Sequence, residues 1–188
     1  MRKKSCGWEG TDPAMIKYHD EEWGVPVYND RKHFEFLILE SAQAGLSWRV
    51  VFNKRAGYRK AFANFDPRKV ARFGSVEIRA MLKNPGVVRN RLKLASAVNN
   101  ARRFLEIQKE FGSFAKYIWS FVDGKPKRGR LKSLKQLPAT SPESDALSLD
   151  LKKRGFKFVG STVIYAHMQA TGLVNDHLVS CFCYSRKK

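Results

Sequence analysis

Long apolar runs are absent from this chain, which nowhere has the about 18 consecutive apolar residues that a membrane-spanning helix needs. Residues 1–10 also lack the apolar core of a secretory signal peptide. We therefore expect a soluble protein of the cytoplasm that makes no use of a membrane.

Cysteine and acidic residues are both scarce. The three cysteines, at positions 6, 181 and 183, are too few and odd in number for a disulfide framework, and they fit a reducing compartment with thiolates bound to metal. Only 17 acidic residues oppose 36 Lys and Arg, which gives a formal net charge of +19. Such an excess makes an anionic polymer the first partner to consider. Nucleic acid ranks above anionic lipid, because no amphipathic basic helix with a broad aromatic face is obvious.

The alternating pattern of a half-buried strand is missing too, and apolar residues recur at helical spacing almost throughout. Five segments combine this spacing with start or stop signals: Asn29 or Asp30 to about Ser41, Arg91 to Gln108, a helix that Ser113 starts, one that ends in Lys152-Lys153-Arg154-Gly155, and one from Ser161 or Thr162 to Gly172. We expect an all-α fold in which residues 1–188 form one unit.

A loop composition occurs only in residues 123–142. This stretch has prolines at 126, 138 and 142 and glycines at 124 and 129, among six Lys and Arg residues. We interpret it as a basic connection between an N-terminal helical body and a C-terminal helical part.

Acids are also absent between Ile78 and Leu105, where seven Lys or Arg residues occur. A Pro-Gly turn lies within this stretch, between two helical patterns. Unpaired backbone N–H groups at such a turn and helix start bind phosphate well. Residues 78–108 are similar to a helix-hairpin-helix clamp for the DNA backbone, and an ordinary helix–helix connection is the alternative. The candidate backbone contacts are Pro85, Gly86, Val87, Val88 and Arg89.

The two ends of the chain carry halves of one possible metal site. Cys6 and His19 lie near the start, and His177 and Cys181 form an H-x3-C pair near the end. Two thiolates and two imidazoles suit tetrahedral Zn²⁺. The spacing leaves open the alternative of buried cysteines and satisfied histidines. In the zinc interpretation Cys183 is the spare cysteine.

Candidate chemistry is concentrated in the first 50 residues, where Tyr18 accompanies three of the four tryptophans, Trp8, Trp23 and Trp48. Glu40 lies on a mostly apolar side of its predicted helix, where a carboxylate loses water and needs a partner. Aromatic rings around a buried carboxylate indicate a pocket for a flat, electron-poor or cationic group. The alternative is that Glu40 caps a helix or reaches the solvent edge.

Several motifs in one order together resemble the bacterial 3-methyladenine DNA glycosylase I family. They extend from Cys6 to Cys181, and so cover nearly the whole chain. The motifs are Cys6-Gly7-Trp8, Tyr18-His19-Asp20-Glu21-Glu22-Trp23-Gly24-Val25-Pro26, Leu39-Glu40-Ser41-Ala42-Gln43-Ala44-Gly45-Leu46-Ser47-Trp48, Arg154-Gly155-Phe156-Lys157-Phe158-Val159-Gly160 and Gly172-Leu173-Val174-Asn175-Asp176-His177.

The resemblance implies a monomeric helix-hairpin-helix glycosylase that acts on double-stranded DNA containing alkylated bases. It implies a structural zinc held by Cys6, His19, His177 and Cys181. It also implies that 3-methyladenine is flipped into the aromatic pocket and that its N-glycosidic bond is hydrolysed. In that picture Glu40 recognises the edge of the base, Trp48 stacks on it, Tyr18 contacts it from another side, and Trp8 and Trp23 shape the pocket wall.

One position departs from the pattern of that family. Met15 stands where the family usually has a tyrosine, three residues before Tyr18. A thioether can pack against a flat base but cannot give the hydrogen bond of a phenol. Met15 could therefore contact the base and alter the range of accepted lesions, or simply fill the core. A zinc-stabilised module that binds lesions without excising them is the remaining alternative.

Overall fold

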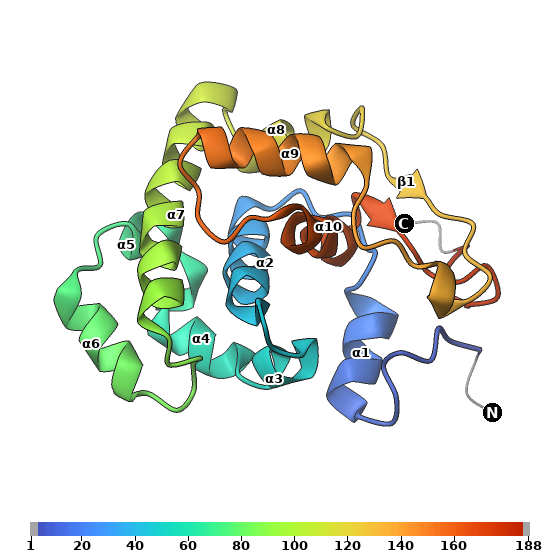
Figure 1. The fold of residues 1–188 in the computed structure, drawn as a ribbon, viewed down its shortest axis with the longest axis horizontal. Coiled ribbons are helices and arrows are strands. Elements are labelled where there is room, and N and C mark those ends of the chain that lie inside the picture. Colours follow the sequence, from blue (N-terminus) through green and yellow to red (C-terminus); the bar gives the residue numbers. More distant parts are fainter. Residues whose placement is uncertain (1–3, 186–188) are drawn as a thin grey trace.

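The computed structural model describes residues 4–185, and helices make up most of it, as predicted (Figure 1). The central element is α2 (Asp30–Gln43), which contacts α7 (Arg91–Phe111), α8 (Phe114–Ser120) and α10 (Ser161–Ala170). All of residues 33–42 are buried, so this helix is covered on every side. No helix within residues 4–185 is both long and apolar enough to span a bilayer.

The remaining elements surround this centre. They are α1 (Pro13–Glu21), α3 (Trp48–Phe52), α4 (Arg55–Ala61), the 3-10 turn η1 (Ala63–Phe65), α5 (Pro67–Val70), α6 (Ser75–Lys83), β1 (Lys127–Arg128), η2 (Leu134–Gln136), α9 (Pro142–Lys153) and β2 (Val174–Asn175). The predicted caps Asn29 and Ser113 are confirmed, because each side chain accepts a backbone N–H in the first turn of its helix. Asn90, which was not predicted, caps α7 in the same way, and α10 begins after Gly160 without a side-chain cap.

A small parallel sheet corrects the expectation that no strand would form. β1 pairs with β2 through Lys127 beside Val174 and Arg128 beside Asn175. The Gly129 N–H donates to the Asn175 carbonyl, and the Val179 N–H donates to the Leu131 carbonyl. Residues 123–142 are therefore held against the C-terminal segment.

Buried side chains form two clusters. The larger one surrounds α2, α7, α8 and α10. The smaller one, here called the terminal cluster, joins the two ends of the chain on the right of Figure 1. Its buried members are Cys6, Met15, Tyr18, Trp23, Phe36, Ala170, Leu178, Cys181 and Cys183.

Contacts between distant segments fix the end of α2. The Lys93 ammonium, at the start of α7, donates to the carbonyls of Ala42 (2.8 Å) and Ala44 (2.5 Å) and so caps the C-terminus of α2. The Ser41 hydroxyl donates to the Phe158 carbonyl at 3.1 Å. The last turn of α2, which carries Glu40, is thereby held from two sides.

Candidate functional site

A pocket of about 190 Å³ lies where α1, α2 and α10 meet. It is smaller than the about 300–1,000 Å³ of sites for drug-sized ligands, and it suits one flat ring system. Five residues predicted to bind a base line it: Trp8, Tyr18, Trp23, Glu40 and Trp48. The structure also adds lining residues that the sequence did not indicate: Gln43, Leu137, Ala166 and Gln169.

Aromatic rings form most of the pocket wall. The Tyr18 ring lies 5.6 Å from that of Trp48, and the Trp8 ring lies 5.1 Å from that of Trp23 in an edge-to-face contact. Among the described residues, the buried indole N–H groups of Trp8 and Trp48 have no acceptor. The pocket therefore offers ring faces to a flat ligand.

Glu40 is 2% exposed and reaches this pocket from α2. Its Oε2 lies 3.1 Å from Nδ1 of His167 on α10. Burial raises the pKa of the Glu40 carboxyl well above its ordinary value. The sequence placed Glu40 on an apolar helix side, and the structure gives it a histidine partner that the sequence did not reveal.

His167 also contacts a second buried histidine, His33. Its Nε2 lies 3.2 Å from Nδ1 of His33, whose Nε2 lies 2.9 Å from the Val27 carbonyl oxygen. Both rings are fully buried. Burial lowers the pKa of His167 to about 3, and burial together with the charge of His167 lowers the pKa of His33 to about 3. Both rings are accordingly neutral at ordinary pH.

Met15 does not line the pocket. It is buried in the terminal cluster, so the packing agrees with core filling and gives no contact through which Met15 would alter the range of lesions. Gln169, by contrast, is a lining residue held in place from behind. Its amide donates to Asp176 Oδ2 at 2.8 Å, and the Tyr165 hydroxyl donates to the same oxygen at 2.6 Å.

Four possible metal ligands converge in the terminal cluster. One donor atom each from His19, His177, Cys181 and Cys183 lies within 4.8 Å of the others. His19 Nδ1 is 2.7 Å from an Asp20 carboxylate oxygen, and His177 Nδ1 is 2.9 Å from the Asn175 amide oxygen. Both contacts favour a proton on Nδ1, and Nε2 of each ring is then the atom that could bind a metal.

Cys6 and Cys183 make different contacts beside this group. The Cys6 sulfur accepts the Leu178 N–H at 3.3 Å, as a thiolate ligand would. Cys183 instead donates its S–H to the carbonyls of His19 and Asp20 at 4.0 Å. Without a bound cation, burial raises the pKa of the Cys6 thiol to about 12, and its neighbour Cys181 adds to this effect. The sequence treated Cys183 as spare, and the structure places it within reach of the site.

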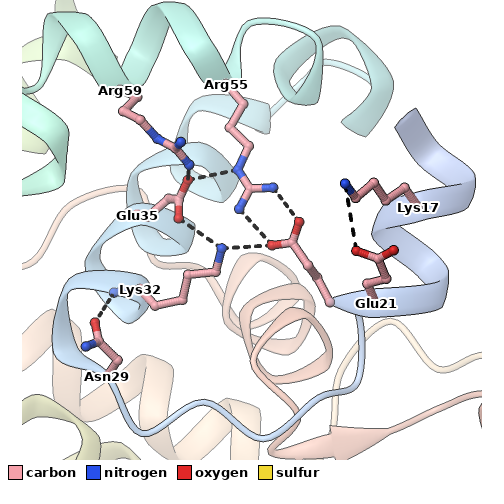
Figure 2. Close-up of polar contacts among 8 residues, drawn as sticks. Lys17, Glu21, Asn29, Lys32, Glu35, Arg55 and Arg59 are labelled. Atoms are coloured by element: carbon pink, nitrogen blue, oxygen red, sulfur yellow. Dashed lines mark hydrogen bonds and ion pairs between the residues drawn. The ribbon is translucent and has the colours of Figure 1, made fainter. Parts of the chain in front are cut away.

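A network of ion pairs joins α2 and α4 to the end of α1 (Figure 2). The Arg55 guanidinium donates to both oxygens of Glu22 and to Glu35, each at 2.8 Å. Lys32 also contacts both acids. Burial alone would raise the pKa of Glu22, but Arg55 and Lys32 hold it at about 2. This network anchors α1, whose Tyr18 lines the pocket, on the central helix.

The turn between α6 and α7 corrects part of the expectation for phosphate binding. The Gly86 N–H donates to the Asn84 side chain at 2.8 Å, the Val87 N–H to the Asn84 carbonyl, and the Val88 N–H to the Tyr58 hydroxyl. The side chain of Val87 is buried. These three N–H groups are therefore used within the protein, because the turn packs on α4, whereas Arg89 is exposed.

Comparisons with known proteins agree over nearly the whole chain. The sequence pattern of the methyladenine glycosylase family matches residues 8–184. DNA-3-methyladenine glycosylase 1 of Escherichia coli is 46% identical over 183 residues, which cover 97% of this chain and 98% of that protein. DNA-3-methyladenine glycosylase of Haemophilus influenzae is 46% identical over 95% of this chain and 96% of that protein.

Solved structures show the same likeness. In Staphylococcus aureus, 3-methyladenine DNA glycosylase I, described for its recognition of 3-methyladenine, superposes with a TM-score of 0.94. It is 36% identical, and the alignment covers 98% of each chain.

Proposed function

The chain belongs to the methyladenine glycosylase family, and we propose that it excises 3-methyladenine from DNA by hydrolysing the N-glycosidic bond of the flipped-out base. The observation that carries the assignment to this pocket is the buried carboxyl of Glu40 among Trp8, Tyr18, Trp23 and Trp48. A flat cation is the ligand that such a combination of ring faces and one carboxyl suits best.

A site that only binds and orients the base is sufficient for this lesion. An adenine alkylated at N3 carries positive charge and is already a good leaving group, so it needs little help from a general acid. Water attacks the sugar, the base departs neutral, and the proton of the attacking water goes to solvent. The protein's task is to bind and orient the cation. We assign recognition of the base edge to Glu40, stacking to Trp48, and contact from another side to Tyr18.

Selectivity follows from the same contacts. Alkylation weakens stacking and pairing, which lowers a flipping cost of roughly a few kcal/mol. A cation gains from the ring faces and from Glu40, whereas neutral adenine gains less from both. Undamaged adenine is thus disfavoured twice, because it costs more to flip out of the duplex and binds the pocket more weakly.

We further propose that Cys6, His19, His177 and Cys181 hold one Zn²⁺ ion, which would supply structural cross-linking rather than chemistry. The donor set supports this, because both imidazoles present Nε2 and the Cys6 sulfur accepts an N–H. Four protein ligands leave no open position for water. Cys183, which donates its S–H elsewhere, stays outside the ligand set in this proposal.

DNA is bound through its backbone in this proposal, with α6, the turn and the start of α7 as the helix-hairpin-helix unit. The net charge of +19 and the exposed Arg89 support it. Since three N–H groups of the turn are used internally, we assign phosphate contact to Arg89 and to the first turn of α7.

Incubation with methylated duplex DNA, followed by chromatography of the released bases, tests the function. We expect free 3-methyladenine from the native protein and at least about 100-fold slower release from Glu40→Gln, because the variant loses the charge that stabilises the cation. Met168→Leu, a buried change on α10 outside the pocket, serves as the matched control. Tight DNA binding without release of any base would instead identify a lesion-binding module.

A further inference from the structure

The buried chain of His33, His167 and Glu40 has a proton count that its geometry fixes. The Val27 carbonyl oxygen faces His33 Nε2 at 2.9 Å and also accepts the Trp119 indole N–H at 2.8 Å. A carbonyl cannot donate, so His33 carries its proton on Nε2. In the neutral ring Nδ1 is then bare, and it accepts the His167 Nε2–H across 3.2 Å.

Glu40, which lines the pocket, is the next group in this buried chain. With its proton on Nε2, neutral His167 presents a bare Nδ1 to Glu40 Oε2 at 3.1 Å. Two lone pairs cannot face each other at that distance in a buried site, so one proton lies between them. Glu40 and His167 together are therefore neutral, and because the His167 ring is itself neutral, the shared proton lies on Glu40 in the protein without a base.

We propose that His167, oriented by His33, is a positioning residue for base excision that shares one proton with Glu40 and leaves Oε1 of Glu40 to the base. The proposal rests on the function proposed above. Among the described residues, Oε1 has no hydrogen-bond partner, while Glu40 itself lines the pocket. The relay thus commits one carboxyl oxygen to the interior and directs the other toward the ligand.

Entry of a cationic base shifts the shared proton. The O–H bond at Glu40 Oε2 breaks and an N–H bond forms at His167 Nδ1, so a carboxylate meets the cation and no proton leaves for water. When the glycosidic bond has been hydrolysed and the base is neutral, the proton returns to Glu40. A neutral base then faces a neutral acid, which weakens its attraction to the site and favours release.

Other ionisable groups contribute little at this point. Tyr18 of α1 lies close enough to Glu40 for the carboxylate to raise the pKa of the phenol, and Asp30 at the start of α2 favours the charged form of His33. For Glu40 and His167 burial is the only cause of the shifted pKa, so α3, α4, α7 and α8, which also pack on α2, add no charge that alters it.

The pH dependence of excision separates this role from simple packing. In the native protein we expect a KM that is flat between about pH 6 and pH 8, because the pair neither gains nor loses a proton. In His167→Phe, Glu40 must give its proton to water, and its pKa is raised. The KM of the His167→Phe variant is therefore expected to be about tenfold higher than that of the native protein at low pH, and to fall as pH rises.

Two further variants separate the orientation of His167 from a general effect of changing the core. His33→Phe, which removes the orientation but keeps the Glu40–His167 contact, is expected to show the same trend more weakly, and Met168→Leu is expected to match the native profile. A flat profile in His167→Phe would overturn the proposal.

Histidine side-chain ¹⁵N NMR of the native protein tests the tautomers without any activity. We expect His33 and His167 both to carry Nε2–H. A neutral His167 with its proton on Nδ1 and an ionised Glu40 would refute the relay. Absence of excision by the native protein with the expected tautomers would instead refute the proposed function alone.

Discussion

The backbones of Gly57 and Gly86 touch. Gly57 lies within α4 and Gly86 in the turn between α6 and α7, and a Cβ on Gly57 would lie 2.2 Å from the Gly86 carbonyl oxygen. Backbone cannot move aside as a flexible side chain can. The pair therefore sets how closely the turn approaches the body of the protein.

Gly57→Ala is expected to destabilise the protein by about 1–3 kcal/mol, the usual cost of overpacking. In most helix interiors the same change stabilises, by roughly 0.5–1 kcal/mol. The sign of the change in urea-unfolding free energy is the measurement. Lys60→Ala, an exposed change on the same helix, is the control and is expected to be nearly neutral. A stabilising Gly57→Ala would show that the close contact does not exist.

Zinc content distinguishes the two candidate cysteines. We expect purified Cys6→Ser to lose the metal, because its sulfur accepts a backbone N–H as a ligand would, and Cys183→Ser to keep one ion per chain. Metal analysis after dialysis measures this. Retention in Cys6→Ser with loss in Cys183→Ser would move the fourth ligand to Cys183.

Removal of the metal should separate folding from chemistry. We expect Cys181→Ser, once folded without zinc, to melt at a lower temperature than the native protein but still to release 3-methyladenine. Circular dichroism and the base-release assay measure the two properties. Complete loss of activity in a protein with an intact fold would show that zinc does more than hold the termini together.

Stability against acid depends on the Arg55 network. The pKa of Glu22 is about 2 in the folded protein against an ordinary value of 4.5. A lowered pKa stabilises the fold above the unfolded value, and this stabilisation is lost as pH falls from about 4.5 toward 2. Glu22→Gln is expected to reduce the unfolding free energy by on the order of 1–3 kcal/mol at pH 6, and by roughly half of that or less near pH 3.

Urea unfolding at the two pH values measures this, and the difference between native and variant removes contributions from other acid-sensitive groups. Lys17 and Glu21 provide a matched control in α1, the helix whose C-cap is Glu22, since both are exposed and their contact is 4.0 Å. Glu21→Gln should change stability little at either pH. An equal loss at both pH values in Glu22→Gln would mean that its charge is not the stabilising feature.

The salt dependence of DNA binding tests the backbone contacts. Arg89→Ala should weaken binding to every duplex sequence and reduce the slope of log affinity against log salt by about one. Lys109→Ala, exposed near the far end of α7, should leave the slope unchanged. Equal effects of both changes would place the DNA elsewhere.

The long helices could be predicted from the sequence because each has several turns of apolar spacing together with a start or stop signal, such as Asn29 before α2 and Gly155 after α9. The short helices α3, α4 and α5 escaped prediction, since one or two turns are too few to establish a period. Helix α2 is buried on all sides, so the side bearing Glu40 could be recognised only as apolar surroundings.

Only the pocket residues that lie close together in the sequence could be predicted. Tryptophans, Tyr18 and Glu40 lie in one stretch of sequence, whereas His167 meets Glu40 across a separation of 127 residues. Leu137 belongs to a segment with the composition of a loop, and its place in the pocket depends on η2 and on the pairing of β1 with β2. Such contacts are set by tertiary packing, which no periodicity reports.

The pocket draws its lining from Trp8 near one end of the chain and Gln169 near the other. A nascent chain on the ribosome therefore has no base pocket until almost all of it has emerged, although its basic helices can already attract nucleic acid. Capture of a base is in this sense a late event of biosynthesis. Any fragment left by premature termination before α10 would lack Ala166 and Gln169 of the pocket lining.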